Sequence, residues 1–226
     1  MSSKTSILEA RNITAIGLVV NLLLSVLKFG LGIWGRSHAV VADAVHSLSD
    51  MGTDLLVLLG LKFWSAPADD RHPYGHARIE TVITLGISLL LAGVAFGLGW
   101  DAIHRIGGKS QSAPMMIAVL GPFISMVVKE ILFRRTRAVG KKIHSSALIA
   151  NAWHHRSDAL SSIPALIAVA VAAVNPKWVF VDSLGALILA IFVLKVAWNI
   201  AAPALSELMD HGASDEDLSV ITLMAE

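Results

Sequence analysis

Long apolar runs, interrupted at a few spaced polar positions, dominate the chain. About 20 apolar residues in a helix span a bilayer core, and runs near that length occur six times. They cover residues 12–34, 40–64, 81–100, 113–133, 145–174 and 180–203. Where such a run is interrupted, as at 40–64, its polar residues fall on one helical face. The pattern predicts an all-α integral membrane protein with a six-helix transmembrane bundle.

The pattern also predicts where the membrane domain ends. All six runs lie within residues 1–206, whereas acidic residues are scattered among apolar ones at 207–226, which is typical of a soluble amphipathic segment. We expect a transmembrane domain at 1–206 and the start of a truncated cytoplasmic domain at 207–226. The first run is too long for the apolar part of a signal peptide, so we expect it to remain as a span.

Lysine and arginine near the span ends predict the orientation, because cytoplasmic loops carry an excess of both. Ten lie on the side of the termini, namely Lys4, Arg11, Lys62, Arg71, Arg78, Arg134, Arg135, Arg137, Lys141 and Lys142. Four lie on the other side, namely Arg36, Arg105, Lys109 and Lys177. Both termini of this multi-pass protein are therefore predicted to be cytoplasmic, in the inner membrane if the source is bacterial.

Composition excludes several classes of protein. Charged residues make up only 15% of the chain, against about 25% in soluble domains, so most of the surface faces lipid. A net charge of +1 leaves no basic surplus for binding nucleic acid. The absence of cysteine rules out disulfides and thiolate metal sites. No Walker A motif occurs, which disfavours ATP-driven transport.

Two spans carry the same pair of titratable residues. His46 and Asp50 are four residues apart, as are His154 and Asp158, so each helix presents an imidazole and a carboxylate on one face. Together they offer two nitrogen and two oxygen ligands, a tetrahedral set that suits Zn²⁺ and leaves Co²⁺, Fe²⁺, Cd²⁺ and Mn²⁺ open. Each pair alone could be a buried hydrogen bond or a contact between helices. Its repetition in two spans favours a metal site.

Other polar residues lie near these pairs. Asp54 continues the row in the second span and is either part of an ion path or a residue of a solvated cavity. His155 and Arg156 point away from the face of His154. We expect His155 to be a supporting or interhelical group, and Arg156 to reach the membrane surface or form an ion pair.

A third cluster lies in the loop between the second and third spans. Asp69, His72 and His76 surround a Pro-Tyr-Gly sequence, which favours a turn that can bring two imidazoles and a carboxylate together. The other interpretation is an ordinary polar loop at a membrane surface.

Three motifs together resemble a known family. HSLSD at 46–50, PADDRHPYGHARIE at 67–80 and HHRSDALSS at 154–162 are similar to the signatures of cation diffusion facilitators, six-span antiporters of divalent metals and protons. The resemblance covers essentially the whole chain. It implies a transport site at His46, Asp50, His154 and Asp158. The histidine at position 46 resembles the residue that zinc-selective members have at the first position of this site.

The resemblance has further implications. It favours a second metal site in the loop at Asp69, His72 and His76. It also implies a homodimer with a charge interlock between Arg78 and Asp210, although a family member has lysine where this chain has arginine. The family's cytoplasmic α/β domain, which binds further metal and helps dimerisation, would follow the last span and is expected to be largely missing.

The leading hypothesis is a secondary transporter, not an enzyme, which exports Zn²⁺ from the cytoplasm by alternating access in exchange for protons. Histidine has an unperturbed pKa near 6.5, so protons and metal can compete for its nitrogen. Two alternatives remain at this point. A metal-sensing or scaffolding membrane protein would bind metal without transport. An intramembrane hydrolase would need an open coordination position and a general base.

Overall fold

The structure is a computed structural model that describes residues 3–63, 77–106 and 112–209. These residues form helices joined by short turns and contain no strand, which confirms the all-α class. The elements are α1 (Ser3–Trp34), α2 (His38–Phe63), α3 (Ala77–Ile106), η1 (Met116–Val119), α4 (Leu120–Lys142), α5 (Ser146–Ser161), α6 (Ile163–Val174), η2 (Pro176–Trp178) and α7 (Phe180–Leu208).

The helices are long and apolar enough to cross a membrane. Within the residues that the structure describes, five stretches qualify by length and composition: Leu8–Trp34, Thr81–Ile106, Met116–Lys142, Leu148–Val174 and Pro176–Leu208. Helix α2 is comparably long but carries three aspartates and two histidines, and it is not among the five. Large apolar side chains such as Leu23, Leu90 and Trp198 are well exposed on the helix surfaces, as expected where a protein faces lipid. The chain is an integral membrane helix bundle.

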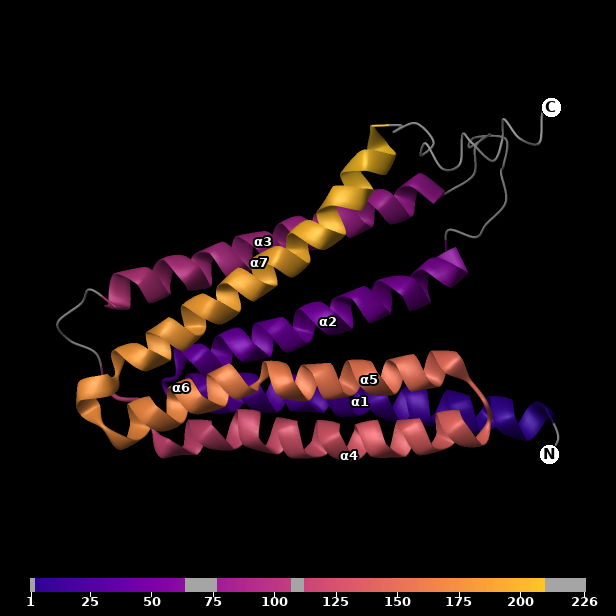
Figure 1. Cartoon of the computed structure of the whole chain (residues 1–226). Coiled ribbons are helices and arrows are strands. Elements are labelled where there is room, and N and C mark those ends of the chain that lie inside the picture. Colours follow the sequence, from indigo (N-terminus) through magenta and orange to yellow (C-terminus); the bar gives the residue numbers. More distant parts are fainter. Residues whose placement is uncertain (1–2, 64–76, 107–111, 210–226) are drawn as a thin grey trace, which may run out of the picture.

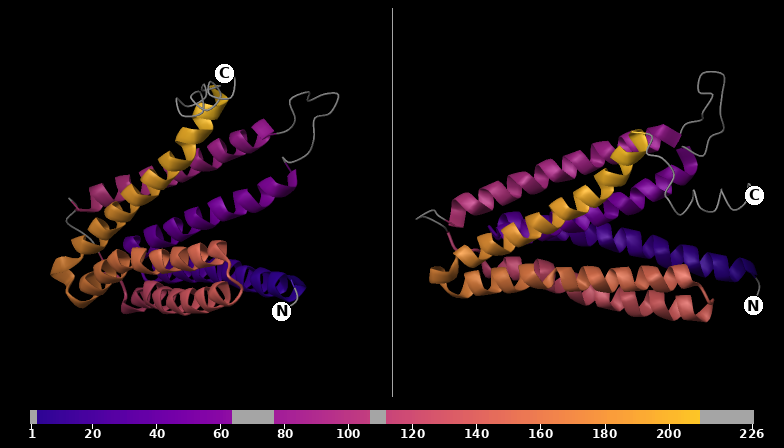
Figure 2. Two further views of the ribbon diagram at one scale, coloured as in Figure 1. Left: turned by 45° about the vertical axis from the view of Figure 1, so that its right-hand side comes forward. Right: turned by 45° about the horizontal axis from the view of Figure 1, so that its top comes forward.

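The helices form two groups with α2 between them. Helices α3 and α7 lie side by side in one group, and α1, α4 and α5 form the other (Figure 1). Three features lie together at one end of the bundle: the start of α1, the end of α7 and the turn from α4 to α5. The two groups approach each other at the opposite end and diverge toward the end where α1 begins and α7 ends (Figure 2).

Small residues allow the close packing at the converging end. A Cβ atom added to Gly185 of α7 would lie 2.4 Å from the Cβ of Ala168 in α6 and 3.2 Å from that of Ala39 in α2. The same core contains buried Ala42, Ala165 and Leu189, among others. The hydrophobic effect does not drive helices together within lipid, because lipid tails are as apolar as the side chains. Membrane helices are therefore stabilised by the van der Waals contacts that such a close backbone approach allows. The helices of this end of the bundle are therefore closely packed.

The segment expected as one span at 145–174 is divided into two helices. Helix α5 ends at Ser161 and α6 begins at Ile163, with Ser162 between them. Pro164 lies in the first turn of α6, where its missing N–H needs no helical partner. The break places the Ser162 side chain at the centre of the bundle, where it contacts α1 and α2.

A network of polar contacts lies at the converging end. Asp182 of α7 accepts hydrogen bonds from the Ser37 hydroxyl and from the His38 backbone N–H (2.7 Å). Arg36, in the turn that precedes α2, adopts a left-handed φ of 54°. The Ser37 hydroxyl also accepts from the Val40 N–H at 3.2 Å, which satisfies an unpaired donor of the first turn. These contacts fix the start of α2 to α7.

Candidate metal site

The first predicted ligand pair lies on α2 within the bundle. His46 Nε2 and Asp50 Oδ2 are 3.9 Å apart, and both side chains are largely buried. His46 Nδ1 has no hydrogen-bond partner among the described residues. The helix backbone alone brings the two groups together, because residues four apart share a face. Within the described part of the chain, one nitrogen of the imidazole therefore has no partner.

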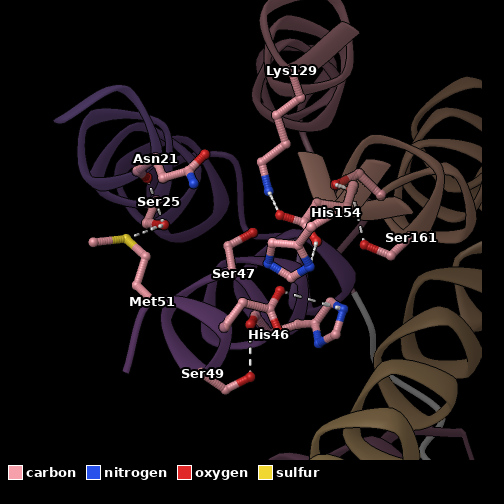
Figure 3. Close-up of polar contacts among 12 residues, drawn as sticks. Asn21, Ser25, His46, Ser47, Ser49, Met51, Lys129, His154 and Ser161 are labelled. Atoms are coloured by element: carbon pink, nitrogen blue, oxygen red, sulfur yellow. Dashed lines mark hydrogen bonds and ion pairs between the residues drawn. The ribbon is translucent and has the colours of Figure 1, made fainter. Parts of the chain in front are cut away.

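The second pair lies on α5. His154 Nδ1 and Asp158 Oδ1 are 3.7 Å apart. The carboxylate is buried, but 43% of the His154 side chain is exposed. Figure 3 shows the imidazoles of His46 and His154 extending into the same region from two helices.

The structure does not gather the two pairs at coordination distance. Among the described residues, no group of three or more His, Asp or Glu side chains is close enough to hold a metal ion. The physical reason is the packing of the helices: α5 packs against α4, whereas α2 packs against α1 and α7. The site composed of His46, Asp50, His154 and Asp158 therefore stays a prediction that requires α2 and α5 to approach each other.

A lysine not singled out from the sequence contacts a predicted ligand. Lys129 of α4 is buried, and its Nζ donates a hydrogen bond to Asp158 Oδ2 at 3.1 Å (Figure 3). The signal was present in the sequence, since a lysine within an apolar span usually marks a functional or paired position. Its partner could not be read from the sequence because it lies 29 residues away on another helix.

A second buried lysine holds three helices together. Lys28 of α1 forms an ion pair with Asp43 of α2 (Nζ to Oδ2, 2.8 Å), and both side chains are fully buried. Its ammonium also donates to Ser47 at 3.0 Å and to Ser162 at 2.8 Å. The Ser162 hydroxyl in turn donates to Asp43 Oδ1 at 3.0 Å. The sequence showed both charges as interruptions of their spans, but it did not show that they pair.

The neighbours of His154 differ in their surroundings. His155 is buried, and neither of its ring nitrogens has a hydrogen-bond partner in the described part of the chain. It lies at the contact with α1, since a Cβ on Gly17 would be 3.3 Å from its Nε2. Arg156 forms an ion pair with Glu130 (Nε to Oε2, 3.8 Å) and lies over the Phe133 ring. His155 is thus interhelical and Arg156 is paired.

Several predicted residues lie outside the described structure. These are the loop residues Asp69, His72 and His76, and Asp210 of the expected interlock. Asp54 and Arg78 belong to α2 and α3, but only their helical backbone is described. The loop site, the interlock and the ion path therefore stay predictions.

Comparison with known proteins gives a consistent result. A family model described as the cation efflux transmembrane domain matches residues 14–209. The uncharacterized transporter MJ0449 of Methanocaldococcus jannaschii is 37% identical, over 82% of this chain and 65% of that protein. Metal tolerance protein C1 of Arabidopsis thaliana is 32% identical over 94% of this chain and 48% of that protein. The manganese efflux system protein MneP of Bacillus subtilis is 31% identical over 92% of this chain and 71% of that protein. The chain thus spans about half to two thirds of the length of the first two of these relatives.

Proposed function

The chain belongs to the cation efflux family, and we propose that it is a secondary transporter that exports a divalent metal cation, Zn²⁺ first, from the cytoplasm. The observation that carries this proposal is the pair of His-xxx-Asp motifs on α2 and α5, both inside a membrane bundle, with the imidazoles of His46 and His154 extending into the same region (Figure 3). Buried ionisable groups of this kind line ion pathways in membrane proteins. Metal flux into sealed proteoliposomes tests the proposal, because a sensor or scaffold would bind metal without flux.

The proposed mechanism is alternating access around the two pairs. The helix groups converge at one end and diverge at the end where α1 begins and α7 ends. Since arginine and lysine are concentrated at that end, we assign it to the cytoplasm. A metal entering there would draw α5 toward α2, as two nitrogen and two oxygen ligands close around it. Opening of the other end would then release the ion outside.

The wider assignments belong to the same proposal. We expect both termini to be cytoplasmic, and the protein to work as a homodimer in the lipid bilayer, which is the inner membrane if the source is bacterial. Protons are the expected counter-ion. The loop at Asp69, His72 and His76 is expected to hold a subsidiary metal at the cytoplasmic mouth, and Arg78 with Asp210 to join the two copies. Asp54 would lie along the ion path.

Manganese is the second candidate cargo. One relative is named a manganese efflux system protein, whereas the two imidazoles proposed here as ligands suit Zn²⁺ better than Mn²⁺, which prefers oxygen. We expect His46→Asp to keep transport but to shift the preference toward Mn²⁺ and Cd²⁺, because one nitrogen ligand becomes oxygen. Competition of each ion against Zn²⁺ flux measures the shift. His104→Asp, at the other end of the bundle, is the control, and an unchanged order of ions in His46→Asp would show that His46 does not set the selectivity.

Proton exchange gives a second expectation. Metal binds only the neutral form of an imidazole, so protons and metal should compete for His46 and His154, and binding should release protons. Affinity should therefore weaken as the pH falls through the range in which histidine protonates. Titration calorimetry in buffers of different ionisation enthalpy counts the protons released. His154→Asn, which offers an oxygen but cannot titrate, should show a shallower pH dependence than the wild type. A proton count of zero would favour a uniporter or a static site.

A further inference from the structure

Lys129 occupies an unusual position within the membrane. It lies in α4, in the middle of the span Met116–Lys142, and only 3% of its side chain is exposed. Glu130, its neighbour in sequence, points elsewhere and pairs with Arg134 and Arg156. The Lys129 ammonium is directed instead to Asp158 on α5. A buried ammonium requires a partner, and here the partner is one of the four predicted metal ligands.

Both carboxylate oxygens of Asp158 face cationic or titratable groups of the chain. Oδ2 accepts the hydrogen bond from Lys129 at 3.1 Å, and Oδ1 lies 3.7 Å from His154 Nδ1. A metal ion bound to Asp158 would need the same oxygen lone pairs. It would also place two positive charges next to the ammonium, in an interior that screens charge poorly. Lys129 and a metal therefore compete for Asp158.

The two buried lysines differ in how fully they are satisfied. Lys28 donates hydrogen bonds to Ser47 and Ser162 and forms an ion pair with Asp43. In the described part of the chain, Lys129 has a single partner, Asp158. Lys28 is thus held by three contacts, whereas Lys129 can leave its partner by breaking one hydrogen bond. We therefore expect Lys28 to keep its contacts and Lys129 to be the lysine that can exchange its partner.

We infer that Lys129 is a tethered cation that neutralises Asp158 while the transport site is empty and is displaced when a divalent metal binds. The inference rests on the proposed function, since it takes Asp158 as a metal ligand. Lys129 keeps the empty carboxylate from remaining as an uncompensated buried charge. It also lowers the affinity for metal, which favours release of the ion after transport. A doubly charged ion displaces the ammonium more readily than a singly charged one.

Two substitutions of Lys129 should change metal affinity in opposite directions. In Lys129→Gln the competing charge is lost, so the dissociation constant for Zn²⁺ should fall by about tenfold or more. In Lys129→Arg the guanidinium holds a carboxylate through two parallel hydrogen bonds, so the dissociation constant should rise several-fold. Titration calorimetry with Zn²⁺ on the full chain in detergent measures both. The melting temperature of the metal-free protein should fall in Lys129→Gln, and added Zn²⁺ should raise it by more than in the wild type.

Lys28→Gln is the matched control, because it breaks a buried ion pair that contains no predicted ligand. It should lower the melting temperature but leave the Zn²⁺ dissociation constant within about threefold of the wild type. If both Lys129 variants bound Zn²⁺ as the wild type does, or if both bound it more weakly, Lys129 would be a purely structural partner and the inference would be wrong. Should Lys129→Gln not fold, a wild-type affinity in Lys129→Arg would by itself overturn the inference. Failure of the proposed function is a separate result, because it would be seen as Zn²⁺ binding by the wild type without Zn²⁺ flux into proteoliposomes.

Discussion

Asp158→Asn is expected to lower Zn²⁺ flux into proteoliposomes by about two orders of magnitude or more, because a site of four ligands loses a charged one. Asparagine suits the test better than alanine. Its amide oxygen can still accept the hydrogen bond that Lys129 donates to Asp158, so the buried ammonium keeps a partner. Loss of flux would then come from the missing negative charge. Zn²⁺ uptake with a fluorescent indicator inside the vesicles measures the effect.

The same substitution away from the site provides the control. Asp101→Asn changes an exposed aspartate at the other end of the bundle, where it pairs with Arg105 and His38. We expect its flux to stay within about twofold of the wild type, as is usual for surface changes. Far-ultraviolet circular dichroism and size exclusion should show both variants folded. Wild-type flux in Asp158→Asn would remove Asp158 from the transport site.

The second large effect is expected on stability. Lys28→Met leaves the fully buried carboxylate of Asp43 without its cation. Breaking a buried pair by removing one partner destabilises a protein by about 3–5 kcal/mol, because the other charge stays buried and uncompensated. The change should also loosen the junction of α5 and α6, since Ser162 loses the donor at 2.8 Å. Reversible unfolding in detergent measures the free energy of unfolding.

The double variant distinguishes charge from packing. In Lys28→Met with Asp43→Leu, both charges are replaced by apolar groups, and such replacements are often neutral or stabilising. The Ser162 hydroxyl already lies 3.5 Å from the Asp158 carbonyl, which offers it another acceptor. We expect the double variant to regain most of the lost stability. A double variant as unstable as the single one would mean that the contacts to Ser47 and Ser162 matter more than the ion pair.

Helix positions could be predicted from the sequence because lipid imposes a strict condition on the backbone. Every N–H and C=O within the bilayer core has to be paired inside the segment, so an apolar run of sufficient length has to be helical. The all-α bundle was therefore predicted correctly. The break at Ser162 was missed, since Pro164 follows the polar residues of α5 in a run that remains apolar beyond it. Composition alone does not reveal a helix end within a span.

The two His-xxx-Asp pairs were also accessible from the sequence, for a local reason. Residues four apart on a helix lie next to each other whatever the rest of the fold does, and the structure has such contacts at 3.9 Å in α2 and 3.7 Å in α5. Nothing local determines the distance between α2 and α5. That distance depends on how α4 and α1 pack around them.

The sequence by itself determined the membrane bundle, the family and the two His-xxx-Asp pairs, because each depends on apolar run length, short motifs or helical spacing. Only the tertiary structure decided which charges meet. The partner of Lys28 is Asp43 and that of Lys129 is Asp158, in both cases on another helix. A buried charge needs an opposite charge nearby, but the sequence alone allows several pairings between the buried lysines and aspartates. The packing of α1, α2, α4 and α5 selects one pairing, since it brings these side chains within hydrogen-bond distance.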